Sequence, residues 1–72
     1  MGSVIDRIQE LAPTMGTFTT RQMAFRAYGE ISTSAVNCTG TKLRALERQG
    51  YVKKVGVVND GGVMMQTWRS IA

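Results

Sequence analysis

Apolar residues recur at helical spacing near the N-terminus, after a serine that can cap a helix. Ser3 lies directly before this stripe, which favours a helix N-terminus there. We expect the helix to end near Leu11 or Ala12, because the residue before Pro13 avoids the helical conformation. Residues 14–16 then form a turn. The apolar stripe consists of Val4, Ile5, Ile8 and Leu11.

A short strand and a second helix are predicted between residues 17 and 29. The run of residues 17–19 is β-prone, with Phe18 as its inward-facing anchor. Thr19 or Thr20 caps the helix, and Gln22 lies near the position that completes a capping box. Gly29 is a natural left-handed stop. The apolar positions of this helix are Met23, Ala24, Ala27 and Tyr28, with Phe25 on a flank, and Ile31 is expected to fill the corner before the next helix.

The third helix lies within residues 34–49 and ends at Gly50. Either Ser34 or Asn37 can cap it, so its start stays open. Gly40 inside the helix costs about 1 kcal/mol relative to alanine, which indicates that the first half is not built for helix stability alone. At about 100° per residue, one side collects the core-facing positions. These are Val36, Thr39, Leu43 and Leu46.

The last third of the chain predicts a β-hairpin. Residues 51–58 are rich in β-branched side chains, residues 59–62 are turn formers, and residues 63–70 form the second strand. Gly56 within the first strand indicates a bulge or a close backbone approach. Trp68 is expected to cover the core, with one of Met64 and Met65 buried and the other semi-exposed. The chain of residues 1–72 is therefore a single α+β domain, mainly helical, with three helices, a short first strand and a C-terminal hairpin.

Composition narrows the function classes. The 72 residues are 43% hydrophobic and 19% charged, which is typical of a folded protein and not of a disordered one. The chain has no histidine and a single cysteine, so zinc fingers, disulfide scaffolds and His-based triads are excluded. We expect no catalytic residue, no metal, no cofactor, no small-molecule substrate and no enzyme activity. No apolar run is long enough to span a membrane. Cys38, a semi-buried free thiol, suits a reducing compartment, so we expect a cytoplasmic protein.

The charge is unevenly distributed. Nine Lys and Arg against five Asp and Glu give a net charge of +4. Residues 1–36 hold three of each sign, whereas residues 37–72 hold six Lys and Arg against two Asp and Glu. A localised basic field favours a polyanionic partner, usually nucleic acid and less often an anionic membrane.

The third helix carries a polar face opposite its core-facing side. Its members lie within about 60° of one another around the helix. Asparagine can pair with adenine and arginine with guanine, while small residues such as Gly40 let a helix backbone approach the major groove. The alternative is an ordinary solvated face. The residues of this polar face are Asn37, Thr41, Arg44 and Arg48.

The order of elements resembles the winged helix-turn-helix family of DNA-binding domains. GTFTTRQMA, residues 16–24, is similar to its first strand leading into the second helix. LRALERQGYVKKV, residues 43–55, is similar to the end of a recognition helix entering the wing, and NDGG, residues 59–62, matches a wing tip. The interval from Gly29 to Gly50 is about one helical turn longer than usual in the family, through either an enlarged turn or a longer helix.

The resemblance implies sequence-specific binding of double-stranded DNA by a small transcriptional regulator, with the third helix in the major groove and the wing on the backbone or in the minor groove. A protein-interaction winged domain and an excisionase-like architectural factor are the alternatives. We also expect a homodimer, through the hairpin or the first helix. Lys53 and Lys54 point to opposite faces of a strand, so only one of them is expected to contact DNA. The implied base contacts are Asn37, Thr41, Lys42 and Arg44, and the implied phosphate contacts are Arg48, Lys53, Lys54, Arg69 and Arg21.

Overall fold

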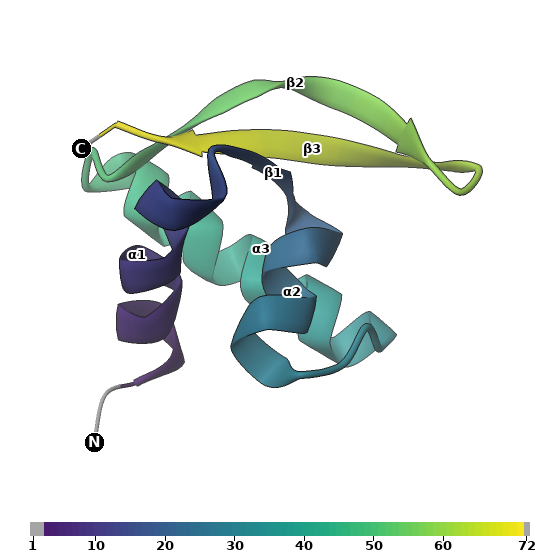
Figure 1. Ribbon diagram of the computed structural model, residues 1–72, viewed down its shortest axis with the longest axis horizontal. Helices are drawn as coiled ribbons and strands as arrows, with labels where there is room; N and C mark the ends of the chain where they lie inside the picture. The colour runs from purple at the N-terminus through teal and green to yellow at the C-terminus, as the bar shows by residue number, and fades with distance from the viewer. Residues whose placement is uncertain (1–2, 72) are drawn as a thin grey trace.

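Three helices lie on one side of a three-stranded antiparallel sheet (Figure 1). The computed structural model describes residues 3–71, with Asp60 by its backbone alone. The predicted α+β, mainly helical fold with a C-terminal hairpin is confirmed. The elements in chain order are α1 (Val4–Met15), β1 (Thr17–Thr19), α2 (Thr20–Tyr28), α3 (Thr33–Arg48), β2 (Val52–Asp60) and β3 (Val63–Ser70).

Helix α1 continues through its proline. It ends at Met15 and is followed by Gly16 at φ 66°, so the expected end before Pro13 is wrong. Pro13 lies in the last turn, where its ring removes a single N–H donor and few helical residues remain to be disrupted. The Thr14 hydroxyl donates to the Leu11 carbonyl at 2.7 Å and satisfies one acceptor of this last turn.

Capping boxes begin the first two helices. Ser3 and Asp6 exchange backbone-to-side-chain hydrogen bonds at the start of α1. Thr19 and Gln22 do the same at α2, at 2.9 and 3.0 Å, which confirms Thr19 as the cap. Gly29 ends α2 in the left-handed conformation at φ 77°, as predicted. The local sequence therefore fixes both ends of α2.

Helix α3 starts earlier than either expected cap. Ser32 is its N-cap, and the Ser32 hydroxyl accepts from the backbone N–H of Ala35 at 3.1 Å. Neither Ser34 nor Asn37 caps the helix, because both lie inside it. The long interval after α2 is thus a longer helix of 16 residues and not an enlarged turn.

The sheet has the order β1-β3-β2. Gly61 and Gly62 form a two-residue loop with φ values of 63° and 87°, and positive φ at both central residues is the signature of a type I′ hairpin turn. The pairing shifts register between Lys54 and Gly56, so the predicted bulge is confirmed. The Gly56 carbonyl accepts from the Thr67 hydroxyl at 2.8 Å across the strands.

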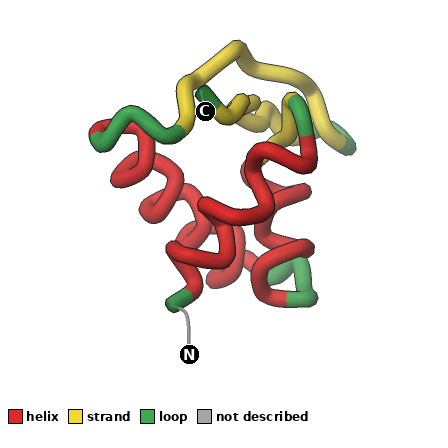
Figure 2. The backbone as a smooth tube through the Cα atoms, turned by 60° about the vertical axis from the view of Figure 1, so that its left-hand side comes forward, coloured by secondary structure: helices red, strands yellow, loops and turns green. Residues whose placement is uncertain are grey.

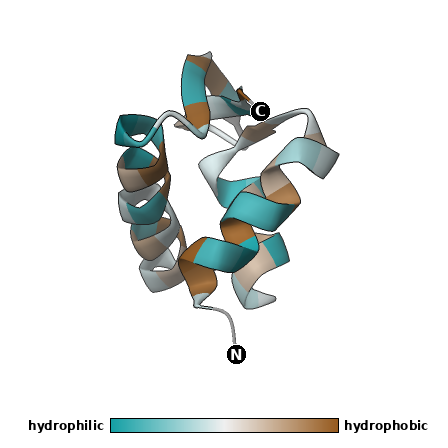
Figure 3. Cartoon of the chain, turned by 90° about the vertical axis from the view of Figure 1, so that its left-hand side faces the viewer, coloured by the Kyte–Doolittle hydropathy of each residue, from teal (hydrophilic) through white to brown (hydrophobic). Residues whose placement is uncertain are grey.

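The core lies between the sheet and the three helices, and the strands sit above the helices also in the rotated view (Figure 2). Trp68 is 2% exposed and covers the core as predicted. Apolar positions recur along each helix between polar ones (Figure 3). None of the helices within residues 3–71 has the length and apolar content that a membrane span requires. The core cluster comprises Ile8, Ala12, Phe18, Met23, Leu43, Leu46, Val52 and Trp68.

Several expected burial positions are wrong. Ile31 is 46% exposed and does not fill the corner between helices. Cys38 is exposed, since it lies on the flank of α3 between the buried face and the polar face. Neither Met64 nor Met65 is buried, because they lie near the hairpin turn, which extends beyond the helices in Figure 1. Val36 is only half-buried.

Candidate nucleic-acid interface

A cleft of about 420 Å³ separates α3 from the hairpin. Polar side chains of both elements line it, and Thr20 and Trp68 reach it from α2 and β3. Elements distant in sequence therefore build one concave surface. The α3 residues lining the cleft are Val36, Asn37, Gly40, Thr41 and Arg44, and the hairpin contributes Lys54, Met65, Gln66 and Trp68.

The outward face of α3 is the predicted polar face. Asn37, Thr41, Arg44 and Arg48 are exposed, on the side opposite the buried part of the helix. The Thr41 hydroxyl donates to the Asn37 carbonyl at 3.1 Å, so its oxygen remains free to accept a further hydrogen bond. Arg48 lies one turn beyond Arg44 on the same face. The helix therefore presents one amide, one hydroxyl and two guanidinium groups to solvent.

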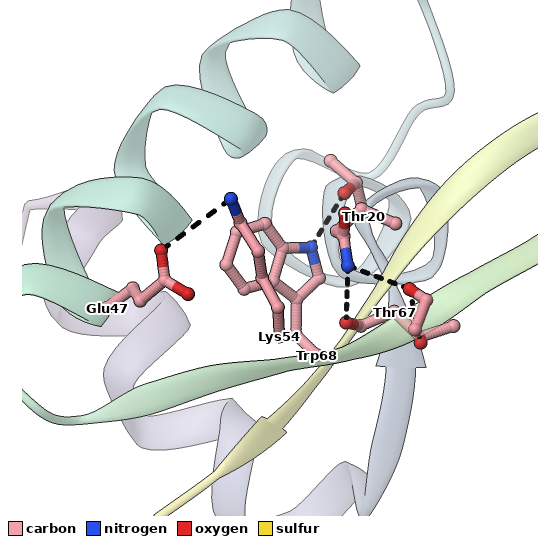
Figure 4. A network of polar contacts seen from close by, with 7 residues as sticks. Thr20, Glu47, Lys54, Thr67 and Trp68 are labelled. Carbon is pink, nitrogen blue, oxygen red and sulfur yellow. Dashed lines mark hydrogen bonds and ion pairs between the residues drawn. The ribbon is translucent and has the colours of Figure 1, made fainter.

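Lys54 brings a cation from the hairpin into this cleft (Figure 4). Its Nζ lies 3.9 Å from Glu47 Oε1 and 5.8 Å from the centroid of the Trp68 ring. The Lys54 side chain is 48% exposed, and an exposed ion pair of this kind contributes about 0–1 kcal/mol. Lys54 can therefore exchange Glu47 for another anion at little cost.

The neighbouring lysine faces the other way. Lys53 pairs with Arg69 across the strands, whereas Lys54 pairs with Trp68, so the two lysines lie on opposite faces as predicted. Lys53 and Arg69 form a second basic group outside the cleft, and both are exposed. Like charges directly opposite each other in a sheet are destabilising.

Arg21 and Lys42 belong neither to the cleft nor to the basic group of Lys53 and Arg69. Arg21 is half-buried at the start of α2 and approaches the hairpin turn, where a Cβ on Gly61 would lie 3.7 Å from its Nη1. Lys42 is half-buried on α3. Residues two apart do not share a helix face, so Lys42 does not join Arg44 in the cleft. The structure thus brings together Asn37, Thr41, Arg44 and Lys54, with Arg48 adjoining them.

Sequence reasoning missed Gln66 and Thr20, which line the cleft, and Glu47, which contacts the cleft residue Lys54. Gln66 donates from Nε2 to the Gly56 carbonyl at 2.8 Å, and its polarity within an apolar strand is the signal that marks it. Glu47 holds Lys54, but their pairing depends on a tertiary contact. Thr20 forms part of the wall, and its Cγ2 lies 3.7 Å from where a Cβ on Gly40 would be. Gly40 therefore faces α2 as well as the cleft.

Comparison with known proteins places the chain in no group. No protein family matches it, and neither a curated protein nor a solved structure does. The arrangement of elements remains consistent with a winged-helix-like layout.

Proposed function

We propose that this chain binds double-stranded DNA through α3 and the base of the hairpin. One observation supports the proposal above the others: the cleft collects Asn37, Arg44 and Lys54 from two elements. Among the described residues that line it there is no carboxylate, and the nearby Glu47 contacts Lys54 in an exposed pair. Cations and an amide on one exposed concave surface suit a polyanion whose bases also offer hydrogen-bond partners.

In the proposed complex, α3 enters the major groove, which is about 12 Å wide and admits one helix. Asn37 and Arg44 have the side chains that form bidentate pairs with adenine and guanine. Thr41 lies between them on the same face and can bind either a base edge or a phosphate. This face would give the complex its sequence preference.

One sugar–phosphate strand lies in the cleft between α3 and the hairpin. Lys54 leaves Glu47 for a phosphate, and Arg48 binds a second phosphate one turn along α3. Lys53 and Arg69 lie on the other face of the sheet, so they bind only a strand that passes outside the cleft. The proposed role is that of a small regulator of transcription in the cytoplasm.

The proposal is tested by titrating duplex DNA at several salt concentrations. We expect the wild-type affinity to fall steeply with salt, because bound cations release counterions from DNA. Selection from random duplexes should return a preferred sequence. Arg44→Ala should weaken binding to that sequence by about 1–3 kcal/mol and relax the preference. Arg7→Ala, which removes an exposed arginine of α1, is the matched control and should leave the preference unchanged. Absence of duplex binding at low salt would overturn the proposal.

A further inference from the structure

The distal hairpin, defined here as residues 55–66, is not built for phosphates. It contains no lysine or arginine of its own, although Arg21 of α2 lies beside its turn. Five of its apolar side chains are between 42% and 65% exposed. A surface with several exposed apolar groups and few cations is typical of a protein interface. The exposed apolar side chains are Val55, Val57, Val58, Val63 and Met64.

Strand β2 also has an unpaired backbone edge. In the sheet order β1-β3-β2, it is an outer strand whose partner within the described residues is β3. The strand spans nine residues and carries no charged side chain between Lys54 and Asp60. Native proteins usually protect such an edge with charges or cover it, because its open N–H and C=O groups pair readily with another strand.

We propose that two copies of this chain pair antiparallel through their β2 edges into one continuous sheet. A two-fold arrangement is self-complementary, so the same open edge and the same apolar side chains meet on both sides. The main-chain groups of β2 thereby gain partners, and its valines lose contact with water.

Charge selects the antiparallel orientation. If Val57 of each copy lies at the two-fold axis, eight residues separate the two Lys53 positions along the strand direction, which corresponds to about 27 Å. This spacing exceeds the screening length of about 8 Å at physiological ionic strength. A parallel pairing would place the basic ends of the hairpins side by side. The antiparallel dimer therefore avoids repulsion between the two copies.

Pairing of the β2 edges does not depend on DNA binding. Arg44 lies on α3, outside the distal hairpin, so pairing leaves the outward face of α3 open. Arg44→Ala should leave dimerisation unchanged even where it weakens duplex binding. Failure of one proposal can therefore be distinguished from failure of the other.

Sedimentation equilibrium without DNA tests the pairing across a wide range of protein concentrations. We expect the average mass to rise from 7.9 kDa toward twice that value. Val57→Lys should raise the dimer dissociation constant at least tenfold, because it places like charges opposite each other where the two β2 strands pair. Phe25→Lys on α2 is the matched control, since it adds the same charge at a similarly exposed apolar site (55% against 54%) and should dimerise like the wild type.

Nuclear magnetic resonance of the wild-type chain adds a test that needs no variant. On dilution, amide shifts should change in residues 52–60 and stay constant in α1. A wild-type chain that remains at 7.9 kDa at every concentration overturns the proposal. So does a dimer that Val57→Lys and Phe25→Lys weaken equally, or one whose dilution shifts lie in α1. Growth beyond the dimer would show open-ended association and would equally exclude the two-fold pairing.

Discussion

The indole Nε1 of Trp68 donates a hydrogen bond of 2.9 Å to the hydroxyl of Thr20, 48 residues earlier in the chain (Figure 4). Both side chains are buried. The bond joins β3 to the first residue of α2, and Thr20 also approaches Gly40 of α3. One side chain thus links the base of the hairpin to the helix that we place in the major groove.

Removing the Thr20 hydroxyl should destabilise the fold. Thr20→Val keeps the shape of the side chain but leaves the buried indole N–H without an acceptor, which costs about 1–3 kcal/mol. Denaturant unfolding followed by the fluorescence of the single tryptophan measures the loss. Thr20→Ser retains the hydroxyl and should cost less than Thr20→Val. Equal stability of Thr20→Val and the wild type would contradict the role of the bond.

Replacing Gly40 of α3 by alanine should raise the stability of the fold and lower its affinity for duplex DNA. Gly40→Ala should stabilise the fold by about 0.5–1 kcal/mol, because alanine loses less backbone entropy on forming a helix. The new Cβ would lie in ordinary contact, 3.7 Å from Thr20 Cγ2. Duplex affinity should fall, since the methyl group enters the floor of the cleft. Thermal unfolding and duplex titration of the same variant measure both effects, and a variant that binds more tightly would refute this view of the cleft.

Neutralising Glu47 should strengthen binding to all duplexes. Glu47→Gln removes the anion that holds Lys54, and it removes a negative charge beside the proposed phosphate site. We expect a several-fold gain in affinity at low salt, with a stability change below about 1 kcal/mol because the pair is exposed. Glu10→Gln makes the same change on α1 and should show no comparable gain. Equal gains from both variants would indicate a mere effect of net charge.

The two adjacent lysines should differ in their contribution to binding. Lys54→Ala should weaken all duplexes alike and reduce the slope of log affinity against log salt by about one. Lys53→Ala removes the same charge from the opposite face of the sheet and should leave the slope nearly unchanged. The measurement is a salt titration of each variant with one duplex. A larger change in slope for Lys53→Ala would reverse the proposed orientation of the hairpin.

Much of the fold could be predicted from local signals. The Thr19 cap, the Gly29 stop, the bulge at Gly56 and the strand at residues 63–70 all follow from short-range chemistry. The end of α1 could not, because the conformational preference before Pro13 is weak compared with the packing of the helix on the core.

The candidate site also combines features that the sequence predicts with features that depend on tertiary packing. The polar face of α3 follows from the helical period, which is a property of the sequence alone. The link between Lys54 and Glu47, the wall formed by Thr20, and the separation of Lys42 from Arg44 depend on how elements pack. The exposed Ile31 and Met64 show the same limit, since an apolar residue is buried only where a neighbouring element reaches it.

The juxtaposition of Lys53 and Arg69 has a consequence for handling the protein. Dissolved ions weaken the repulsion between these two cations, so added electrolyte should make the native chain more resistant to unfolding. The same ions also compete with the protein for the phosphates of DNA, its proposed partner. Buffers that preserve the chain best would therefore be those in which its proposed activity is hardest to detect.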